Sequence, residues 1–486
     1  MEEKNGIILL GLGPGDPKHL TREAWQILET VDEVYVRTSQ HPTIAGFPKD
    51  LKVYSFDLVY EEKEKFEDVY AEIIKEIIEL GKRPEGVVYA VPGHPFIAET
   101  TGPEIFRQAK EQGIQTRIVE GISFLAPVLA SLGVDPLPQL TMVDAHEMVM
   151  AHHPSFPPSV PALIAQVHSK EIASELKITL MALYPDEHPV RFVHGAGTND
   201  AQLEELKLYE IDQSEYIGLL SSLFIPPLGD NTSFEDFQEL IAHLRSPEGC
   251  PWDREQTHQS LRTNLLEEAY EVLNAIDHDA PKEMEEEFGD LLLQIVLHAQ
   301  IASEYGEFNM SSIIKGIHNK LVRRHPHVFK DVESLEPDVV LKNWEKIKAE
   351  ERSDNGDEEK GILDGVPTDM PALAVADKYQ KRAARVGFDW PEIDGVFDKI
   401  MEEIKEFEDA ENPEEKAEEI GDLIFAVANL ARWIDVDPET ALRETNLKFK
   451  KRFAVIEATA KGQGKELSDL SLEEMDAIWE ESKKGE

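Results

Sequence analysis

Residues 265–298 read LLEEAYEVLNAIDHDAPKEMEEEFGDLLLQIVLH, and the C-terminal half of the chain is best understood from this stretch. Two segments with helical spacing flank a turn at residues 277–281. Each segment carries acids three residues apart, Glu268 and Glu271 in the first and Glu287 and Asp290 in the second. Residues three or four apart share one face of a helix. The pattern therefore predicts a helical hairpin with carboxylates along one side.

Apolar residues in both segments predict how the two helices pack. Leu265, Val272 and Ile276 follow one stripe, and Leu291 and Ile295 follow another. Short-linked helices with apolar stripes pack antiparallel, which sets the four acids against each other. Close carboxylates repel unless they are protonated or bridged by cations. Oxygen ligands without nearby histidine or cysteine favour Mg²⁺ or Mn²⁺ over zinc. The alternative is a solvated acidic helix face.

A second copy of the acidic pattern lies near the C-terminus and favours the metal-site interpretation. Its acids are Glu403, Glu406, Glu419 and Asp422. Downstream, Lys320 and Arg324 are matched at the same spacing by Lys448 and Arg452, and Trp344-Glu345 is matched by Trp479-Glu480. Four matches in the same order indicate an internal repeat. We expect two helical modules, at residues 235–350 and 371–486.

Composition narrows the class of protein. The chain has 486 residues, enough for two to four domains at about 150 residues each. Its net charge of -47 argues against binding a nucleic-acid polymer, which needs basic patches. Cys250 is the single cysteine, so we expect a reducing, cytoplasmic location. The acidic N-terminus does not resemble a signal peptide, and no apolar run reaches the roughly 20 residues of a membrane span.

The N-terminal part has a different texture. Short apolar runs alternate with helical periodicity over residues 1–225, which predicts an α/β domain. Prolines and a glycine at residues 226–234 indicate a linker, and helical periodicity dominates beyond it. Residues 351–370 begin with a charged stretch that lacks an apolar face, and we expect a second linker there. The predicted chain is multi-domain, with an α/β domain followed by two all-α modules.

Three glycine turns follow predicted strands of the α/β domain. They lie at residues 11–17 (GLGPGDP), 91–95 (VPGHP) and 120–123 (EGIS). Glycine after a strand lets the backbone approach a ligand closely. The carboxyl ends of neighbouring parallel strands meet at one sheet edge, where open α/β domains bind ligands. A single such turn is a weak signal, because ordinary tight turns contain the same residues.

The acidic repeat resembles the MazG-type nucleoside triphosphate pyrophosphohydrolases. The resemblance rests on EExxE followed by ExxD before leucine in both copies, and on residues 250–258 and 378–390 as module openings. It implies an all-α fold, a dimer-like pairing of helices, and hydrolysis of a nucleoside triphosphate to the monophosphate and diphosphate. The metal ligands implied are Glu268, Glu271, Glu287, Asp290, Glu403, Glu406, Glu419 and Asp422, with Glu268, Glu271, Glu403 and Glu406 also catalytic.

The basic residues fit the same chemistry. Lys448 and Arg452 lie four apart on one helical face and can hold phosphates, and Lys320 and Arg324 have that role in the first module. A carboxylate can position or deprotonate the attacking water. The resemblance implies that Trp479 stacks on the base; the alternative is a tryptophan that packs between helices. For Lys320 and Arg324 the alternative is a solvated basic face.

The glycine turns resemble the tetrapyrrole (corrin/porphyrin) methylases, which use S-adenosylmethionine. The resemblance covers about 220 residues and implies two α/β subdomains with the cofactor in the cleft between them. Cofactor-binding residues would be Gly11, Gly13, Pro14, Gly15, Asp16, Gly93, His94, Pro95, Gly121, Ile122 and Ser123. His94 replaces the acid of the commoner GDP turn, and Glu120 replaces the proline of PGIS. The methyl acceptor is therefore left undefined, and His94 is either a base or a turn residue.

The leading interpretation is a cytoplasmic enzyme that joins a methylase-like domain to a tandem pyrophosphohydrolase. It would act on nucleoside triphosphates, form a homodimer through the helical modules, and use Mg²⁺ or Mn²⁺ and S-adenosylmethionine. One alternative is a methyltransferase whose helical modules sense nucleotides or drive assembly. Another is a non-enzymatic acidic scaffold whose helices dimerise.

Overall fold

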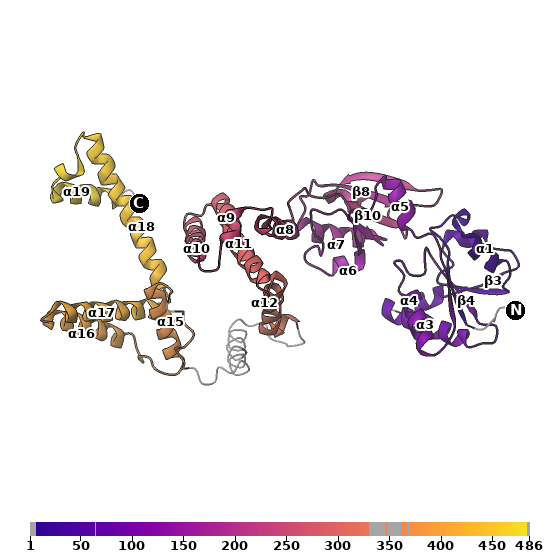
Figure 1. Cartoon of the computed structure of the whole chain (residues 1–486), viewed down its shortest axis with the longest axis horizontal. Coiled ribbons are helices and arrows are strands. Elements are labelled where there is room, and N and C mark those ends of the chain that lie inside the picture. The colour runs from indigo at the N-terminus through magenta and orange to yellow at the C-terminus, as the bar shows by residue number, and fades with distance from the viewer. Residues whose placement is uncertain (1–5, 64, 330–346, 348–360, 368, 484–486) are drawn as a thin grey trace. The chain divides into compact units, whose positions relative to one another are not determined.

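The structure confirms the predicted order of an α/β region followed by helices. The computed structural model describes residues 6–63, 65–329, 347, 361–367 and 369–483 (Figure 1). The chain divides into two compact units, Met1–Ile313 and Ile314–Glu486. The first unit contains the α/β region and the first helices, and the second contains only helices among its described residues.

The first sheet is parallel and has the strand order β3-β2-β4-β1-β5. Its strands are β1 (Ile7–Gly11), β2 (Glu33–Val36), β3 (Lys52–Ser55), β4 (Val87–Val91) and β5 (Thr116–Val119). Helices cover both faces: α1 (Arg22–Leu28) packs on one, and α3 (Phe66–Gly81) and α4 (Thr101–Glu111) pack on the other. The short helix α2 (Asp57–Glu62) precedes α3. Because both faces are covered, the central strand β4 is buried throughout.

The second sheet is mixed, with the order β6-β7-β10-β8-β9. Its strands are β6 (Thr141–Asp144), β7 (Ala162–Ala165), β8 (Pro189–His194), β9 (Gln202–Lys207) and β10 (Ser221–Ile225). Strands β6 and β7 are parallel, and the other pairs are antiparallel. Helices α6 (Ala145–Val149) and α7 (Lys170–Met181) pack on one face, and α5 (Leu125–Leu132) packs on the other. Short 3₁₀ turns lie at Pro17–His19, Pro42–Gly46 and Leu208–Gln213.

Helices begin after the predicted linker. Strand β10 ends at Ile225 and α8 begins at Phe234. The helices of this region are α8 (Phe234–Arg245), α9 (Pro251–Glu255), α10 (Arg262–Asp277), α11 (Pro281–Glu304), α12 (Met310–Arg324) and α13 (Pro326–Phe329). A buried arginine joins two of them, because Arg245 Nη2 lies 2.7 Å from Glu304 Oε2 of α11. The division between the two compact units falls within α12.

The second compact unit repeats a hairpin of similar form. Its described elements are α15 (Ala372–Ala384), α16 (Asp394–Asp409), α17 (Pro413–Trp433), α18 (Pro438–Gly462), a 3₁₀ turn (Leu467–Asp469) and α19 (Leu472–Lys483). Pro281 and Pro413 occupy the first turns of α11 and α17, where the missing N–H costs nothing. The two predicted acidic segments thus both form helical hairpins, α10–α11 and α16–α17. Trp344-Glu345 lies outside the described residues.

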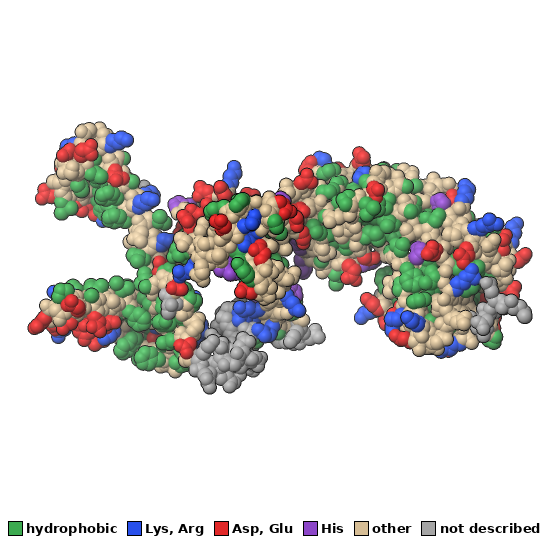
Figure 2. Space-filling model, viewed as in Figure 1, with side chains coloured by type: hydrophobic (Ala, Val, Ile, Leu, Met, Phe, Trp, Pro, Cys, Tyr) green, Lys and Arg blue, Asp and Glu red, His purple; other side chains and the backbone are tan. Residues whose placement is uncertain are grey.

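No helix among the described residues is long and apolar enough to cross a bilayer. Both hairpins nevertheless leave large apolar side chains exposed. These are Leu266, Tyr270, Ile276, Phe288, Leu292 and Ile295 in the first, and Phe397, Met401, Ile420, Ile424, Phe425 and Val427 in the second. Figure 2 shows apolar and acidic side chains together over the α16–α17 hairpin. The predicted apolar stripes are therefore only partly covered within each hairpin.

His41 couples the folding of the first sheet to pH. Its side chain is 6% exposed, and neither ring nitrogen has a hydrogen-bond partner. Burial lowers its pKa from 6.5 to about 4, so the unfolded chain binds a proton that the folded chain rejects. Stability from neutral His41 is complete above pH 6.5 and is lost as the pH falls toward 4. The loss approaches ~3 kcal/mol for a shift of this size.

We expect the urea midpoint of the wild-type chain to fall more between pH 7.5 and pH 5 than that of His41→Phe, whose apolar ring cannot take up the proton. His152→Phe, at an exposed histidine, is the control and should behave like the wild type. Equal midpoint losses in the wild type and His41→Phe would contradict this role of His41.

Candidate functional sites

The three glycine turns meet at the carboxyl edge of the first sheet. Gly13 N–H donates to Gly93 O at 3.1 Å, and Gly93 N–H donates to Gly13 O at 2.8 Å. A Cβ on Gly121 would lie 2.2 Å from Gly93 O, and one on Gly11 would lie 2.6 Å from Gly121. Only glycine permits such close backbone approach. The structure therefore brings together the turns after β1, β4 and β5.

The first turn also reaches the second sheet. Asp16 N–H donates to Gly197 O, at 3.2 Å, in the loop after β8. A Cβ on Gly197 would lie 2.6 Å from Pro14 Cγ, and one on Gly15 would lie 2.7 Å from Thr198. The glycine turns therefore lie against the loop that follows β8, between the two sheets. This is the placement of a ligand edge in an open α/β fold.

The remaining residues of these turns have mostly structural contacts. His94 Nδ1 accepts a hydrogen bond from Phe96 N–H at 3.1 Å, which closes the turn after β4. This contact supports the turn interpretation of His94 that the sequence left open. Pro95 O lies against Gly102, where a Cβ would come within 2.1 Å. Ile122 is 39% exposed, so the third turn has an apolar side chain at the surface.

The first hairpin places three carboxylates in one group. Oxygen atoms of Glu268 (α10), Glu287 and Asp290 (α11) lie within 4.8 Å of one another. Burial, followed by the charges of Asp290 and Glu271, raises the pKa of Glu268. Burial and then Glu271 raise the pKa of Glu287. Glu271 therefore adjoins the group without belonging to the three close oxygens.

The second hairpin also assembles three carboxylates, but not the equivalent three. Oxygens of Glu403 and Glu406 (α16) and Glu419 (α17) lie within 4.8 Å of one another. Asp422 lies outside this set, although its charge contributes to raising the pKa of Glu419, after burial and after Glu406 and Glu403. Each predicted group of four acids is thus partly assembled, with three close oxygens and a neighbouring fourth carboxylate.

Glu403 differs from the other acids of these groups. It is 4% exposed, and its Oε2 atom has no hydrogen-bond partner. Its Oε1 atom lies 2.8 Å from Lys399 Nζ, one helical turn earlier on α16. Hydrogen bonds to Glu403 and Glu402 raise the pKa of Lys399. Sequence reasoning missed Lys399, although its four-residue spacing from Glu403 was a usable signal.

The predicted phosphate-binding residues of the second module lie together on other helices. Lys448 and Arg452 lie on α18, and the Arg452 guanidinium lies 5.6 Å from the centre of the Trp479 ring on α19. Trp479 also lies 5.2 Å from the Phe449 ring and packs on the small core around Ile456. Trp479 is thus engaged in helix packing, which was the alternative to base stacking.

Lys320 and Arg324 both lie on α12, one helical turn apart. Lys320 is exposed and Arg324 is half-buried. This part of α12 belongs to the second compact unit, whereas Glu268 and Glu287 belong to the first. The structure therefore places the two basic residues on one helix, and their role at the first acid group stays a prediction.

Comparisons with known proteins agree with both halves of this architecture. The family model for tetrapyrrole (corrin/porphyrin) methylases matches residues 6–212, and that for the MazG nucleotide pyrophosphohydrolase domain matches residues 256–329. The uncharacterised protein YabN of Bacillus subtilis is 43% identical over 494 residues, which cover 99% of both chains. The nucleoside triphosphate pyrophosphohydrolase/pyrophosphatase MazG of Thermotoga maritima is 45% identical over 253 residues, 52% of this chain and 96% of that protein. The chain belongs to the MazG family, with a tetrapyrrole methylase-like region ahead of its MazG region.

These matches confirm both predicted family resemblances and the prediction that the chain is an enzyme. The MazG family model ends at residue 329, whereas the Thermotoga relative matches 253 residues, more than the first helical module contains. A solved uroporphyrin-III-C-methyltransferase from Thermus thermophilus is 19% identical with a TM-score of 0.35, covering 46% of this chain and 93% of that one.

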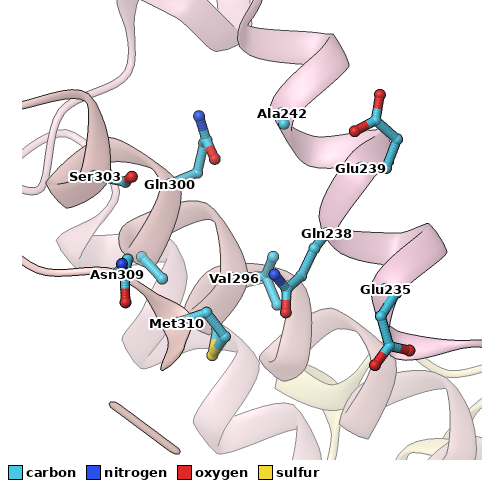
Figure 3. Close-up of a pocket in the computed structure, with 10 residues that line it drawn as sticks. Glu235, Gln238, Glu239, Ala242, Val296, Gln300, Ser303, Asn309 and Met310 are labelled. Atoms are coloured by element: carbon cyan, nitrogen blue, oxygen red, sulfur yellow. The ribbon is translucent and has the colours of Figure 1, made fainter. Parts of the chain in front are cut away.

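One groove of the helical part of the first compact unit is separate from the predicted metal ligands. It has a volume of about 300 Å³ and is lined by α8, by the C-terminal half of α11 and by the start of α12. Figure 3 shows Gln238 and Glu239 of α8 on one side and Gln300 of α11 on the other. None of the predicted site residues lines it. Its mixed lining offers no converging set of groups, so we assign it no chemistry.

Proposed function

We propose that the MazG region hydrolyses a nucleoside triphosphate to the monophosphate and diphosphate with a divalent cation, Mg²⁺ or Mn²⁺. The main support is that two helical hairpins each hold three carboxylate oxygens within 4.8 Å of one another. Burial, followed by the charges of neighbouring carboxylates, raises the pKa values of Glu268, Glu287 and Glu419, so these groups favour a bound cation or proton. The Thermotoga relative, named for this activity, supports the same reaction.

The donor set fits a hard cation. The groups contain only carboxylates, and the buried Oε2 of Glu403 lacks a partner. We assign the cation to Glu268, Glu271, Glu287, Asp290, Glu403, Glu406, Glu419 and Asp422. When bound, such an ion neutralises phosphate oxygens and favours attack on the α-phosphorus.

The chain's own groups would supply the remaining chemistry. We assign Glu268 and Glu271, and likewise Glu403 and Glu406, to orienting and deprotonating the attacking water. The phosphates would contact Lys320, Arg324, Lys448 and Arg452, with Trp479 at the edge of the base. Arginine suits this role because its planar fork binds two phosphate oxygens at once.

We propose that the α/β region binds S-adenosylmethionine and transfers its methyl group to an acceptor molecule. Support comes from the contact of three glycine turns at one sheet edge and from the family match over residues 6–212. The assigned residues are Gly11, Gly13, Pro14, Gly15, Asp16, Gly93, His94, Pro95, Gly121, Ile122 and Ser123. Backbone groups exposed by glycine turns suit the polar tail of such a cofactor.

The element boundaries support five segments. We propose an α/β domain at 1–225, a linker at 226–234, a first helical module at 235–350, a second linker at 351–370 and a second module at 371–486. Strand β10 ends at Ile225, α8 begins at Phe234 and α15 begins at Ala372. A single cysteine suits a reducing cytoplasm, which we propose as the location.

Hydrolysis should depend on both the acids and the cation. We expect Glu403→Gln with Glu406→Gln to lower magnesium-dependent diphosphate release by about 100-fold, since loss of a positioned base has effects of that order. Glu268→Gln with Glu271→Gln, tested separately, reports on the first module. Glu285→Gln and Glu408→Gln change exposed acids of the same hairpins and serve as controls. Unchanged diphosphate release in a variant that carries all four of these substitutions would refute the assignment.

Cofactor binding should depend on the glycine contact. Isothermal titration of the full chain with S-adenosylmethionine should give saturable heat, and Gly121→Ala should abolish it, because the new Cβ would lie 2.2 Å from Gly93 O. Gly218→Ala is the control, since its new Cβ would lie 4.0 Å from Tyr216 O, the nearest atom beyond the adjoining residues. A far-UV circular dichroism spectrum and a urea midpoint close to those of the wild type show that the α/β region of each variant folds. Absence of heat and of a thermal shift in the wild type removes the cofactor proposal.

We propose that the exposed apolar residues of the hairpins pack against a second copy of the chain. Leu266, Phe288, Phe397 and Met401 are each at least 48% exposed, which is costly for residues of this size. Sedimentation equilibrium should give about twice the chain mass of 54.9 kDa. Phe288→Ser with Phe397→Ser should shift the mass toward one chain, and a wild-type monomer would contradict the proposal.

A further inference from the structure

A cluster of polar and aromatic side chains, used by neither proposed reaction so far, joins the two sheets of the α/β region. Arg37 follows β2 and forms an ion pair with Glu99, which follows β4. The Glu99 side chain is 1% exposed. Arg37 Nε donates to Tyr60 Oη at 3.0 Å, and the guanidinium lies 5.7 Å from the centre of the Tyr70 ring. The positive charge of Arg37 is therefore already neutralised by Glu99.

Two histidines extend from the second sheet. His146 and His168 approach through their Nε2 atoms at 3.0 Å, so one ring donates and the other accepts. Asp144 ends β6 and accepts from His146 N–H at 2.8 Å, and His168 follows β7. Strands β6 and β7 are parallel neighbours, so these three residues come from one sheet edge. Burial and then the charge of His146 lower the pKa of His168, which favours its neutral ring.

Aromatic rings connect these two halves. The Phe66 ring, at the start of α3, lies 5.8 Å from the His146 ring and 6.1 Å from the Tyr70 ring. Tyr60 lies 6.4 Å from Phe66. Asp144 is close enough to contribute to raising the pKa of Tyr70, after burial and other charges. Phe66 is 50% exposed and both histidines are partly exposed, so a ligand can reach this surface.

Backbone strain occurs beside the cluster. Ala98 (φ 52°) directly precedes Glu99, and Gln166 (φ 65°) lies two residues before His168. Within the described ranges, the other non-glycine residues of positive φ are Asn231, Asp279 and Asp435, whose side chains tolerate this conformation. Ala98 and Gln166 do not belong to the residue types that tolerate a positive φ. Unfavourable backbone conformations of this kind concentrate at ligand sites, where a fixed geometry is needed.

We define the acceptor cluster as Tyr60, Phe66, Tyr70, Asp144, His146 and His168. We propose that it is the methyl-acceptor site and that it takes a flat amine, a ring system that carries a protonated nitrogen. This rests on the proposed use of S-adenosylmethionine. The cluster offers aromatic faces, one carboxylate and a hydrogen-bonded imidazole pair, and Arg37 beside it is paired with Glu99. Aromatic faces and carboxylates attract cations, whereas a polycarboxylate acceptor would need unpaired basic groups.

The transfer step balances without another reactant. In the tautomer that we propose, His168 donates its Nε2 proton to His146, so the ammonium group gives one proton to Nδ1 of His168 and the imidazole pair takes up the positive charge. The nitrogen lone pair then forms a bond to the methyl carbon. The carbon–sulfur bond breaks with its electrons on sulfur, leaving S-adenosylhomocysteine. The positive charge of the sulfonium passes to the methylated nitrogen.

Binding tests the site without the cofactor. Tryptamine and indole-3-acetate share an indole ring and differ in the sign of their charge, so their dissociation constants for the full chain isolate the charge preference. We expect tryptamine to bind at least about 10-fold more tightly, and Asp144→Asn to remove most of that preference, because asparagine keeps the cap of α6 and loses the charge. Glu147→Gln, at an exposed acid of α6, is the matched control and should preserve it.

Three results would overturn the proposal: equal or tighter binding of indole-3-acetate, an unchanged preference in Asp144→Asn, or no binding of either probe. Transfer from methyl-labelled S-adenosylmethionine to tryptamine gives a second readout. His168→Gln should keep tryptamine binding and KM but lower kcat by about 100-fold. If the wild type binds tryptamine and no cofactor, the proposed methyl donor fails while the amine site stands. If kcat is unchanged in His168→Gln, the proton-acceptor role fails.

Discussion

Repulsion between carboxylates is the constraint on which the helical half of the molecule depends. Each hairpin holds three acidic oxygens within 4.8 Å, and helix packing buries Glu403 and partly covers Glu268, Glu287 and Glu419. Apolar contacts between α10 and α11, and between α16 and α17, hold charges together that would otherwise separate. Helix packing thus holds the carboxylates so close that a bound cation or proton is needed to reduce their repulsion.

Glycine has the corresponding role in the α/β region. Backbone from three strand ends meets at Gly11, Gly93 and Gly121 with no room for a side chain. The first turn then touches the loop after β8, so one backbone contact orders both the sheet edge and its approach to the second sheet. Three residues of the acceptor cluster, Asp144, His146 and His168, end or follow the parallel strands β6 and β7 of the second sheet. In both sheets, the residues assigned to ligands therefore lie at the carboxyl ends of parallel strands.

Much of this was predictable because local patterns determine it. The strands that precede the three glycine turns, β1, β4 and β5, were expected because their runs are short and bounded. Strands β3, β6, β8, β9 and β10 were not predicted individually. Of these, β3 and β9 lie at sheet edges and expose most of their residues, which leaves little buried periodicity. The hairpins followed from spacing, but which three oxygens come close did not. That depends on side-chain conformation and on neighbours such as Lys399.

Contacts between distant residues account for the rest of what sequence could not supply. Glu99 pairs with Arg37 across 62 positions, and no periodicity links His146 to His168. Trp479 had two interpretations of equal merit from sequence; its contacts with Phe449 and Arg452 show helix packing, and its contact with a base stays a prediction. Family resemblance identified the glycine and acid residues but said nothing of the imidazole pair, which depends on the parallel pairing of β6 and β7.

Lys399 makes the charge around the carboxylates of the second hairpin different from that of the first. Its ammonium group already occupies one oxygen of Glu403, whereas the matching position of the first hairpin is Asn264, which carries no charge. A cation that enters the second hairpin must compete with the ammonium group of Lys399 for Glu403. A cation that enters the first hairpin meets no charged side chain at the matching position, Asn264. Two sites built from the same motif would then fill at different ion concentrations. A single chain would then bind cations in two steps, each at its own ion concentration, instead of in one step.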